Sequence, residues 1–347
     1  MPKKIPIAAS AAAWLGKGVI RFSLLMIAAA AVAAVAAGFG VAYDHSYLKA
    51  SILTGSQEGQ YHALAARLAD RARSERGVLN VIPTAGSIEN VARLAAGRQH
   101  CTEMFALIQD GTPVPAEARL ELLGRLPQPE TLLLLARQGH GFHNFSDLRG
   151  VSIGIGPEGS GTAHLMHRVF NDPDLRGLDS HLSNHELNDQ AELVAKGELD
   201  IAAFVMQEDA EFLHDVIRRY GLDIVSPGDL QGLIARHPWL RLGRISAGRY
   251  DLVRSLPALD RPVAQLSTLL ITNSCAQRAD RVALLMLAAA ELPGFVRNNP
   301  PSALSSVTAL KLAPSAHDFF LGGGPELAFR ANCKRASSRF VAAQRST

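Results

Sequence analysis

Two patterns of hydrophobic and polar residues alternate along the chain from about residue 47. Apolar runs that end in turn residues predict strands at 47–55, 78–86, 104–111, 131–139, 151–156, 200–206 and 265–274. Apolar residues at helical spacing predict helices at 59–75, 87–97, 161–170, 188–199, 210–221 and 278–295. Because strands and helices alternate, we expect an α/β fold with mostly parallel sheets covered by helices. The alternation forms two series, at about 47–130 and 131–250, which predicts two lobes, and a Pro-, Gly- and Arg-rich loop at 226–255 precedes the closing strand and helix.

A different pattern occupies the start of the chain. Positions 22–43 contain no charged residue, and this length is close to the ~20 residues that a helix needs to cross a membrane. Four basic residues precede the run and Asp44 follows it, so the positive-inside rule predicts that segment 1–21 is cytoplasmic and that the rest lies outside. Two alternatives remain: an uncleaved transmembrane anchor, or a secretory signal cleaved near Ala34–Ala36. The length of the run favours the anchor, and both alternatives export the body from Asp44 onward.

Composition narrows the class of protein. Hydrophobic residues make up 48% of the chain and charged residues 19%, which supports well-packed cores. The net charge of +3 and the aromatic content of 6% give no footprint for nucleic acid, so we expect no nucleic-acid partner. Cys101, Cys275 and Cys333 match no metal motif. We expect ordinary small side chains at all three, although one pair could form a disulfide, and we expect no metal site.

Three turns carry the candidate chemistry, because each follows a predicted strand and precedes a predicted helix. They are Thr54-Gly55-Ser56, Gly86-Ser87 and Ser160-Gly161-Thr162. The first amide groups of a helix lack internal partners, and the helix dipole adds partial positive charge, so a carboxylate fits there without an arginine. We therefore expect these turns to bind a small organic anion. The alternative is that their hydroxyl groups only cap helices.

Other polar residues are placed to line the same site. Tyr61 and Asn90 lie in the first turns of two predicted helices, and Gln109, Asp110 and Gln207 end predicted strands. Ligands in open α/β sheets bind beyond the carboxyl ends of the strands, where these residues lie. For Tyr61 the alternative is a core aromatic residue.

The glycines of the third turn also fit another motif. Gly154, Gly156 and Gly159 match G-x-G-x-x-G, which is typical of dinucleotide binding. That site needs an acidic residue at the end of the next strand, and 172–186 contains no apolar run that predicts a strand. A dinucleotide-dependent enzyme is therefore a remote alternative. The chain also lacks G-x-S-x-G and GK[ST] motifs, so we expect no catalysis and no cofactor.

Five motifs, in order, resemble the TAXI-type solute receptors of tripartite ATP-independent periplasmic (TRAP) transporters. They are ILTGSQEGQYHALAARLA (52–69), VIPTAGSIENVARLAAG (81–97), FALIQDGT (105–112), FSDLRGVSIGIGPEGSGT (145–162) and LVAKGELDIAAFV (193–205). A sixth, LAPSAHDFF (312–320), departs from the family pattern at Ala313 and Ser315.

The resemblance implies a two-lobed periplasmic-binding-protein type II fold with the ligand between the lobes, here preceded by the N-terminal transmembrane helix. Lobe 1 would comprise 44–132 and 250–325, lobe 2 would comprise 133–249, and the basic tail 326–347 would be disordered. It implies a solute-binding protein on the periplasmic side of the inner membrane that captures a carboxylate or amino acid, with a TRAP permease as its partner. The alternative is a membrane-anchored sensory or adaptor protein with the same binding domain.

Overall fold

The computed structural model describes residues 25–28, 44–57, 59–304 and 310–325. The chain divides into two compact units, residues 1–45 and 46–347. The expected cytoplasmic segment 1–21 and tail 326–347 lie outside the described residues, and so does the expected anchor 22–43 apart from a helical stretch at 25–28. No helix among the described residues combines the length and the apolar character needed to span a bilayer.

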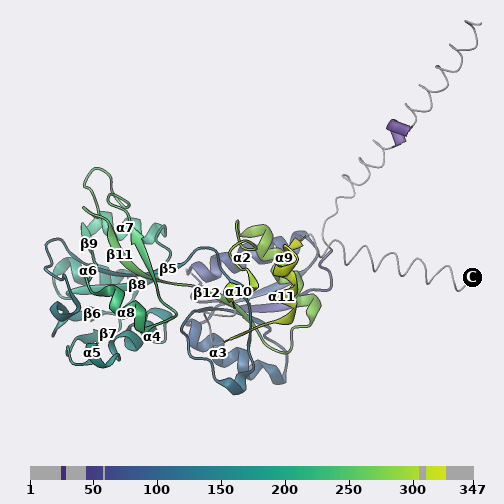
Figure 1. The fold of residues 1–347 in the computed structure, drawn as a ribbon, viewed down its shortest axis with the longest axis horizontal. Coiled ribbons are helices and arrows are strands. Elements are labelled where there is room, and N and C mark those ends of the chain that lie inside the picture. Colours follow the sequence, from purple (N-terminus) through teal and green to yellow (C-terminus); the bar gives the residue numbers. More distant parts are fainter. Residues whose placement is uncertain (1–24, 29–43, 58, 305–309, 326–347) are drawn as a thin grey trace, which may run out of the picture. The chain divides into compact units, whose positions relative to one another are not determined.

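The second unit contains two sheets, each in its own lobe (Figure 1). The sheet of the first lobe has the strand order β13-β4-β12-β3-β1-β2. Strands β1, β2 and β3 run parallel, whereas β12 is antiparallel to both of its neighbours. Its strands are β1 (Lys49–Leu53), β2 (Val78–Ile82), β3 (Phe105–Gln109), β4 (Glu121–Arg125), β12 (Thr268–Thr272) and β13 (Lys311–Leu312). Its helices are α2 (Gln60–Ser74), α3 (Ser87–Ala96), α9 (Arg278–Glu291), α10 (Pro301–Leu304) and α11 (Pro314–Leu321).

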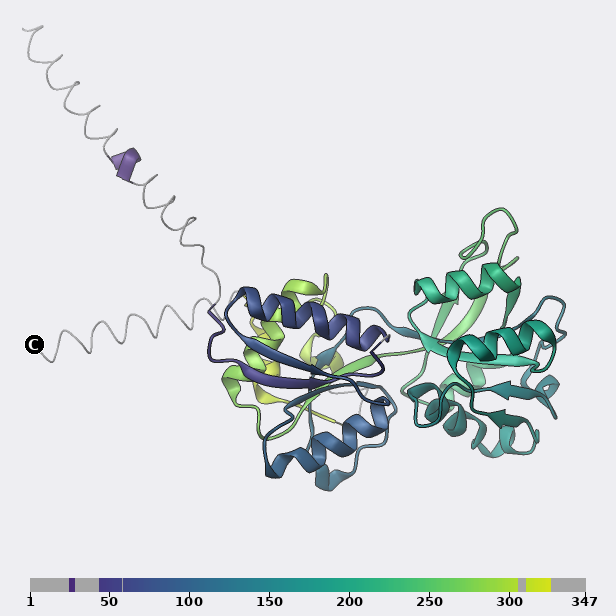
Figure 2. The same cartoon turned by 180° about the vertical axis from the view of Figure 1, so that it is seen from behind.

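The second lobe, on the right in Figure 2, has a sheet of strand order β10-β11-β5-β8-β6-β7, with β9 also paired to β5. Its strands are β5 (Glu130–Arg137), β6 (Ser152–Gly154), β7 (His181–Ser183), β8 (Ile201–Met206), β9 (Leu222–Val225), β10 (Arg241–Ile245) and β11 (Arg261–Leu266). Its helices are α4 (Gly161–Phe170), α5 (Pro173–Arg176), α6 (Leu187–Lys196), α7 (Glu211–Tyr220) and α8 (Leu230–Arg236).

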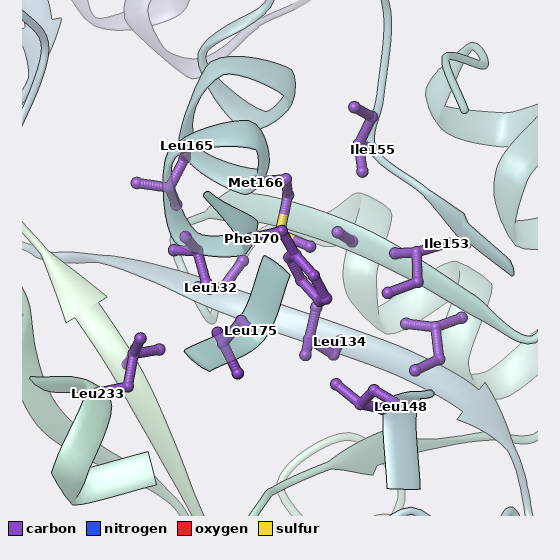
Figure 3. Close-up of a cluster of buried hydrophobic side chains, with 14 of the residues drawn as sticks. Leu132, Leu134, Leu148, Ile153, Ile155, Leu165, Met166, Phe170, Leu175 and Leu233 are labelled. Atoms are coloured by element: carbon purple, nitrogen blue, oxygen red, sulfur yellow. The ribbon is translucent and has the colours of Figure 1, made fainter. Parts of the chain in front are cut away.

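The apolar run of β5 explains how the second lobe is packed. Leu132 and Leu134 join one buried cluster with residues of α4 such as Met166 (Figure 3). Leu133 and Leu135 point the other way and join a second cluster with residues of α6 and α7. Successive side chains of a strand alternate between faces, so a strand buried on both faces needs a continuous apolar run.

The chain crosses between the sheets twice. It leaves the first sheet after β4 and enters the second at β5, and it returns at Ser267, between β11 and β12. The predicted single strand at 265–274 is therefore two strands in different lobes. The second lobe extends to Leu266, beyond the expected limit of residue 249. Two hydrogen bonds at the first lobe fix the crossing, from the Asp110 amide to the Ser267 carbonyl (2.8 Å) and from the Leu126 amide to the Thr268 carbonyl (2.9 Å).

Two other expectations about the fold are wrong. The sheets are mixed rather than mostly parallel, because the crossing strands β5, β11 and β12 pair antiparallel with their neighbours. The predicted loop at 226–255 contains α8 and β10, and β10 is held by antiparallel pairing with β11. That pairing partner lies later in the chain, so the local composition gave no signal for it.

Cys101 and Cys275 form a disulfide, with a Cα–Cα distance of 5.3 Å and a sequence separation of 174 residues. The expectation of three ordinary thiols is therefore wrong for this pair, while Cys333 lies outside the described residues. The bridge joins the early and late segments of the first lobe, and the loop that it closes contains the whole second lobe. Disulfides persist in oxidising compartments, which agrees with export of the body.

Candidate functional site

Buried hydrogen bonds hold the first two turns of lobe 1 together. Thr54 is fully buried, and its hydroxyl donates to the Ile82 carbonyl at 3.0 Å. The Asn90 amide nitrogen donates to the carbonyls of Thr54 (2.5 Å) and Leu107 (2.7 Å), and its oxygen accepts from the Thr84 hydroxyl (2.7 Å). The Asn90 side chain thus joins the ends of β1 and β3 to the turn before α3, and both of its donor hydrogens are used. This geometry assigns Asn90 to positioning the turns.

In lobe 1, the residues that cap the N-termini of α2 and α3 are glycines rather than residues with hydroxyl groups. Gly86, not Ser87, is the N-cap of α3, and its φ of 135° suits glycine. Ser87 is the first helical residue, and its hydroxyl accepts a hydrogen bond from the backbone amide of Gln109 at 2.9 Å. Helix α2 begins at Gln60 after the N-cap Gly59, so Thr54-Gly55-Ser56 does not open the helix directly. Ser56 is exposed.

In lobe 2 the third turn opens α4 as expected. Ser160 is the N-cap, and its hydroxyl accepts from the Ala163 amide at 3.1 Å. Gly161 and the buried Thr162 are the first helical residues. The fully buried Gln190 holds the preceding loop, because its oxygen accepts from the Gly156 amide (2.9 Å) and its nitrogen donates to the Ala203 carbonyl (2.8 Å).

The turns of the two lobes meet. A Cβ atom added to Gly86 would lie 3.4 Å from the Gly161 nitrogen, and one added to Gly161 would lie 2.5 Å from Gln109 Oε1. The backbone amide of Gln207, just after β8, donates to the Gln60 side chain at 3.2 Å. The structure therefore brings the second and third turns, Gln109 and Gln207 to the boundary between the lobes. The first turn is joined to the second within lobe 1, because the Thr84 amide donates to the Gly55 carbonyl at 3.1 Å. Gln60 was not among the predicted site residues.

A buried acid lies at this boundary. Glu130, the first residue of β5, is 4% exposed, and its carboxylate accepts from Gln109 Nε2 at 2.9 Å. Burial raises the pKa of Glu130 to about 7, although the neighbouring Tyr61, Gln109 and Thr268 side chains favour the charged form. Sequence reasoning missed Glu130. Its only local signal was an acidic residue at the start of a continuous apolar run.

Tyr61 lies over the first turn and beside this acid. Its ring lies within van der Waals reach of Gly55, and its hydroxyl is buried next to Glu130 and Thr268 without a well-formed hydrogen bond to any described residue. Burial, with the negative charge of Glu130, raises the pKa of the Tyr61 hydroxyl well above its usual value. The phenol is therefore neutral and lies beside Glu130 and Thr268 at the boundary between the lobes.

Asp110 faces a cavity of about 390 Å³ that residues of both lobes line. Lobe 1 contributes Ile108 and residues 110–114, and lobe 2 contributes His164, Arg168 and Trp239. The Arg168 guanidinium carbon lies 4.7 Å from the Trp239 ring centroid. Burial raises the pKa of Asp110 to about 6, and the charges of Arg125, Arg241 and Arg168 act in the opposite direction. Arg168 and Trp239 were also not predicted.

The glycine motif of the third turn has a structural role. An added Cβ atom on Gly154 would lie 3.0 Å from Gln190 Oε1 and from Leu199 Cδ1. A strand, β7, does follow α4, so the expectation of no strand in 172–186 is wrong. The residue after β7 is Asn184, which donates to the Gly156 carbonyl at 2.9 Å. The position that dinucleotide-binding sites give to an acid thus carries an amide that closes the loop.

A search of curated proteins finds no match. Among solved structures, a putative periplasmic sulfonate-binding protein SsuA from Methylobacillus flagellatus KT is 13% identical, with a TM-score of 0.45 over 78% of this chain and 76% of that one. The alkanesulfonate-binding protein SsuA from Xanthomonas axonopodis pv. citri, bound to MOPS, is 15% identical, with a TM-score of 0.41 over 86% and 94%. A substrate-binding protein of an amino acid ABC transporter is 10% identical, with a TM-score of 0.41 over 69% and 92%.

The topology described above, with two α/β lobes and two crossings, is a periplasmic-binding-protein-like fold. Residues 52–273 match the NMT1-like family, which covers most of both lobes. The chain belongs to the NMT1-like family.

Proposed function

We propose that this protein is an extracytoplasmic solute-binding protein that captures a small organic anion, a carboxylate or an amino acid, between its lobes. The observation that carries the proposal is the meeting of the second and third turns beside Gln109, which bonds to the buried Glu130. It is a binding protein rather than an enzyme.

The helix ends at this boundary suit a carboxylate. Helices α2, α3 and α4 each begin there, and each has at least ten residues. Their first amide groups and their dipoles attract an anion. Gly86 and Gly161 allow the backbone of each lobe to approach the ligand closely, because neither carries a side chain.

Glu130 suits a positively charged group on the same ligand. A buried carboxyl with a pKa of about 7 is readily ionised when a cation pairs with it. Gln109 and Tyr61, beside it, offer further hydrogen-bond partners. A carboxylate at the helix ends and an ammonium at Glu130 together favour an amino acid over a simple dicarboxylate.

Entry of the ligand requires the lobes to separate, because the turns are in contact. The two crossing segments are the hinge for this movement. The resemblance to TAXI-type receptors supports delivery to a TRAP-type permease, with the protein held on the periplasmic side of the inner membrane by its N-terminal segment.

The test is calorimetric titration of the full chain with a panel of dicarboxylates, oxoacids and amino acids. L-glutamate and 2-oxoglutarate form a matched pair, since both have two carboxylates and only one has an ammonium. We expect at least one amino acid to bind, and we expect Glu130→Gln to weaken amino-acid binding more than oxoacid binding. Correctly folded protein that binds no member of the panel would contradict the proposal.

A further inference from the structure

A second cavity, of about 570 Å³, lies against both crossing segments. The cavity is lined at the first crossing by residues 125–127 and Pro129, and at the second by residues 265–267. Arg241 of β10 and part of the segment 297–303, which follows α9, complete the lining. None of the residues predicted to bind the solute lines this cavity. It is therefore a separate space that borders the hinge.

Three arginines line the cavity and no acid does. They are Arg125 at the end of β4, Arg241 at the start of β10, and Arg297. Within the described part of the chain, none of the three has a carboxylate at ion-pair distance. Asp110, which lines the other cavity, interacts with Arg125 and Arg241 through its charge and forms no ion pair with them.

Of the three arginines, Arg125 has the buried guanidinium group whose charge is least compensated by hydrogen bonds. It is 6% exposed, and its Nε and one terminal nitrogen are buried without a hydrogen-bond partner among the described residues. Its backbone is held in place, because its amide donates to Asn299 Oδ1 (2.7 Å) and its carbonyl accepts from Asn299 Nδ2 (2.8 Å). A buried cation without partners is costly, and a second arginine nearby adds repulsion.

An anion in the cavity removes both costs. Arginine guanidinium groups match the geometry of phosphate and carboxylate oxygens and bind them through paired hydrogen bonds. The cavity is large enough for an anion with several oxygens, and the three arginines approach it from β4, β10 and the segment after α9. Arg125 and Arg297 belong to lobe 1 and Arg241 belongs to lobe 2.

We propose that this cavity binds a small multivalent oxyanion at the hinge. Because the bound anion contacts arginines from both lobes and both crossing segments, its occupancy is linked to the angle between the lobes. The cavity is thus an effector site, distinct from the solute site at the three turns.

Calorimetric titration of the full chain with inorganic pyrophosphate tests the proposal, with sodium chloride at matched ionic strength as the reference. The variant is the double substitution Arg241→Gln with Arg297→Gln, which leaves the buried Arg125 in place. Arg244→Gln is the matched control, because Arg244 lies on the same strand, is 69% exposed, pairs with Asp260 at 3.1 Å and does not line the cavity. A titration with citrate shows whether phosphate or carboxylate oxygens are preferred.

We expect pyrophosphate or citrate to bind the wild type, the double variant to bind at least tenfold more weakly, and Arg244→Gln to match the wild type. The proposal is overturned if the wild type binds neither anion, or if the double variant binds as tightly as the wild type. Thermal unfolding of each variant confirms that it is folded.

Discussion

In both lobes a buried side-chain amide holds the turn that lies at the boundary between the lobes. In lobe 1 the fully buried Asn90 joins the turn after β1 to β3, and in lobe 2 the fully buried Gln190 joins the loop after β6 to β8. Each amide accepts one hydrogen bond and donates to backbone carbonyls. Such satisfied, buried polar groups fix one backbone conformation. The positions of both turns are therefore set by interactions within each lobe.

The lobes differ in what they present at the boundary. Lobe 1 presents the side chains of Tyr61 and Gln109, and Gln109 contacts the buried Glu130 at the start of β5. Lobe 2 presents Ser160, whose hydroxyl caps its own helix, and Gly161, which has no side chain. Under the proposed function, Tyr61, Gln109 and Glu130 would contact the solute through their side chains at this boundary, whereas Gly161 would contact it through its backbone.

The largest expected effect is a loss of stability in lobe 1 when its disulfide is removed. Replacing Cys101 and Cys275 by serine removes the cross-link in lobe 1, and loop entropy predicts a loss of about 5 kcal/mol for a loop of this length. Hydrogen exchange monitored by mass spectrometry should show faster exchange in β1, β3 and α9, with little change in β5 and β8. Equal acceleration in both lobes would contradict the assignment of the disulfide to lobe 1 alone.

The second prediction compares how much the buried side chains of Asn90 and Gln190 contribute to the free energy of unfolding. Asn90→Ala should reduce the free energy of unfolding by about 3 kcal/mol, because it removes three buried hydrogen bonds, although the Thr84 hydroxyl still donates to the Thr54 carbonyl at 3.2 Å. Gln190→Ala leaves fewer groups unpaired, one amide and one carbonyl, so a loss of about 2 kcal/mol is expected. Urea denaturation measures both, and a negligible loss for either variant would show that its turn is held by other contacts.

The third prediction concerns pH and Glu130. Burial raises the pKa of Glu130 to about 7, so the folded protein keeps a proton that the unfolded chain releases above about pH 4.5. Stability from this group is therefore present at low pH and is lost as the pH rises towards 7. Relative to the wild type, Glu130→Gln should gain about 2 kcal/mol between pH 5 and pH 8. Denaturation at both values measures the gain.

A matched control for that experiment is Glu117→Gln, because Glu117 is an exposed acid of lobe 1. Asp110, whose pKa burial raises to about 6, titrates in the same window in both proteins, so its contribution cancels in the comparison. A constant difference between Glu130→Gln and the wild type across the pH range would show that Glu130 is ionised throughout.

Local patterns predicted the parts of the site that local residues build. The turns before α3 and α4 carry glycine and serine next to clear strand and helix patterns, and both form. The role of Asn90 was not predictable, because its partner carbonyls belong to Thr54, in the turn after β1, and to Leu107 of β3. Glu130 likewise depends on a tertiary neighbour, Gln109. The split at Ser267 was hidden because two adjacent apolar strands in different sheets look like one run.

The smallest change in the protein tests the central claim, that solute binds where Gly161 meets Gln109. An added Cβ at Gly161 would lie 2.5 Å from Gln109 Oε1, whereas one at Gly177 would contact nothing within 4 Å. Gly177→Ala is therefore the matched control in the same lobe. Alanine also favours the helix that Gly161 begins, so Gly161→Ala should not lower stability.

The measurement is calorimetric titration of wild type, Gly161→Ala and Gly177→Ala with whichever of the dicarboxylates, oxoacids and amino acids binds the wild type. The account predicts that Gly161→Ala binds about tenfold more weakly, a loss of about 1.4 kcal/mol, and that Gly177→Ala matches the wild type. Equal affinity in all three proteins would contradict it.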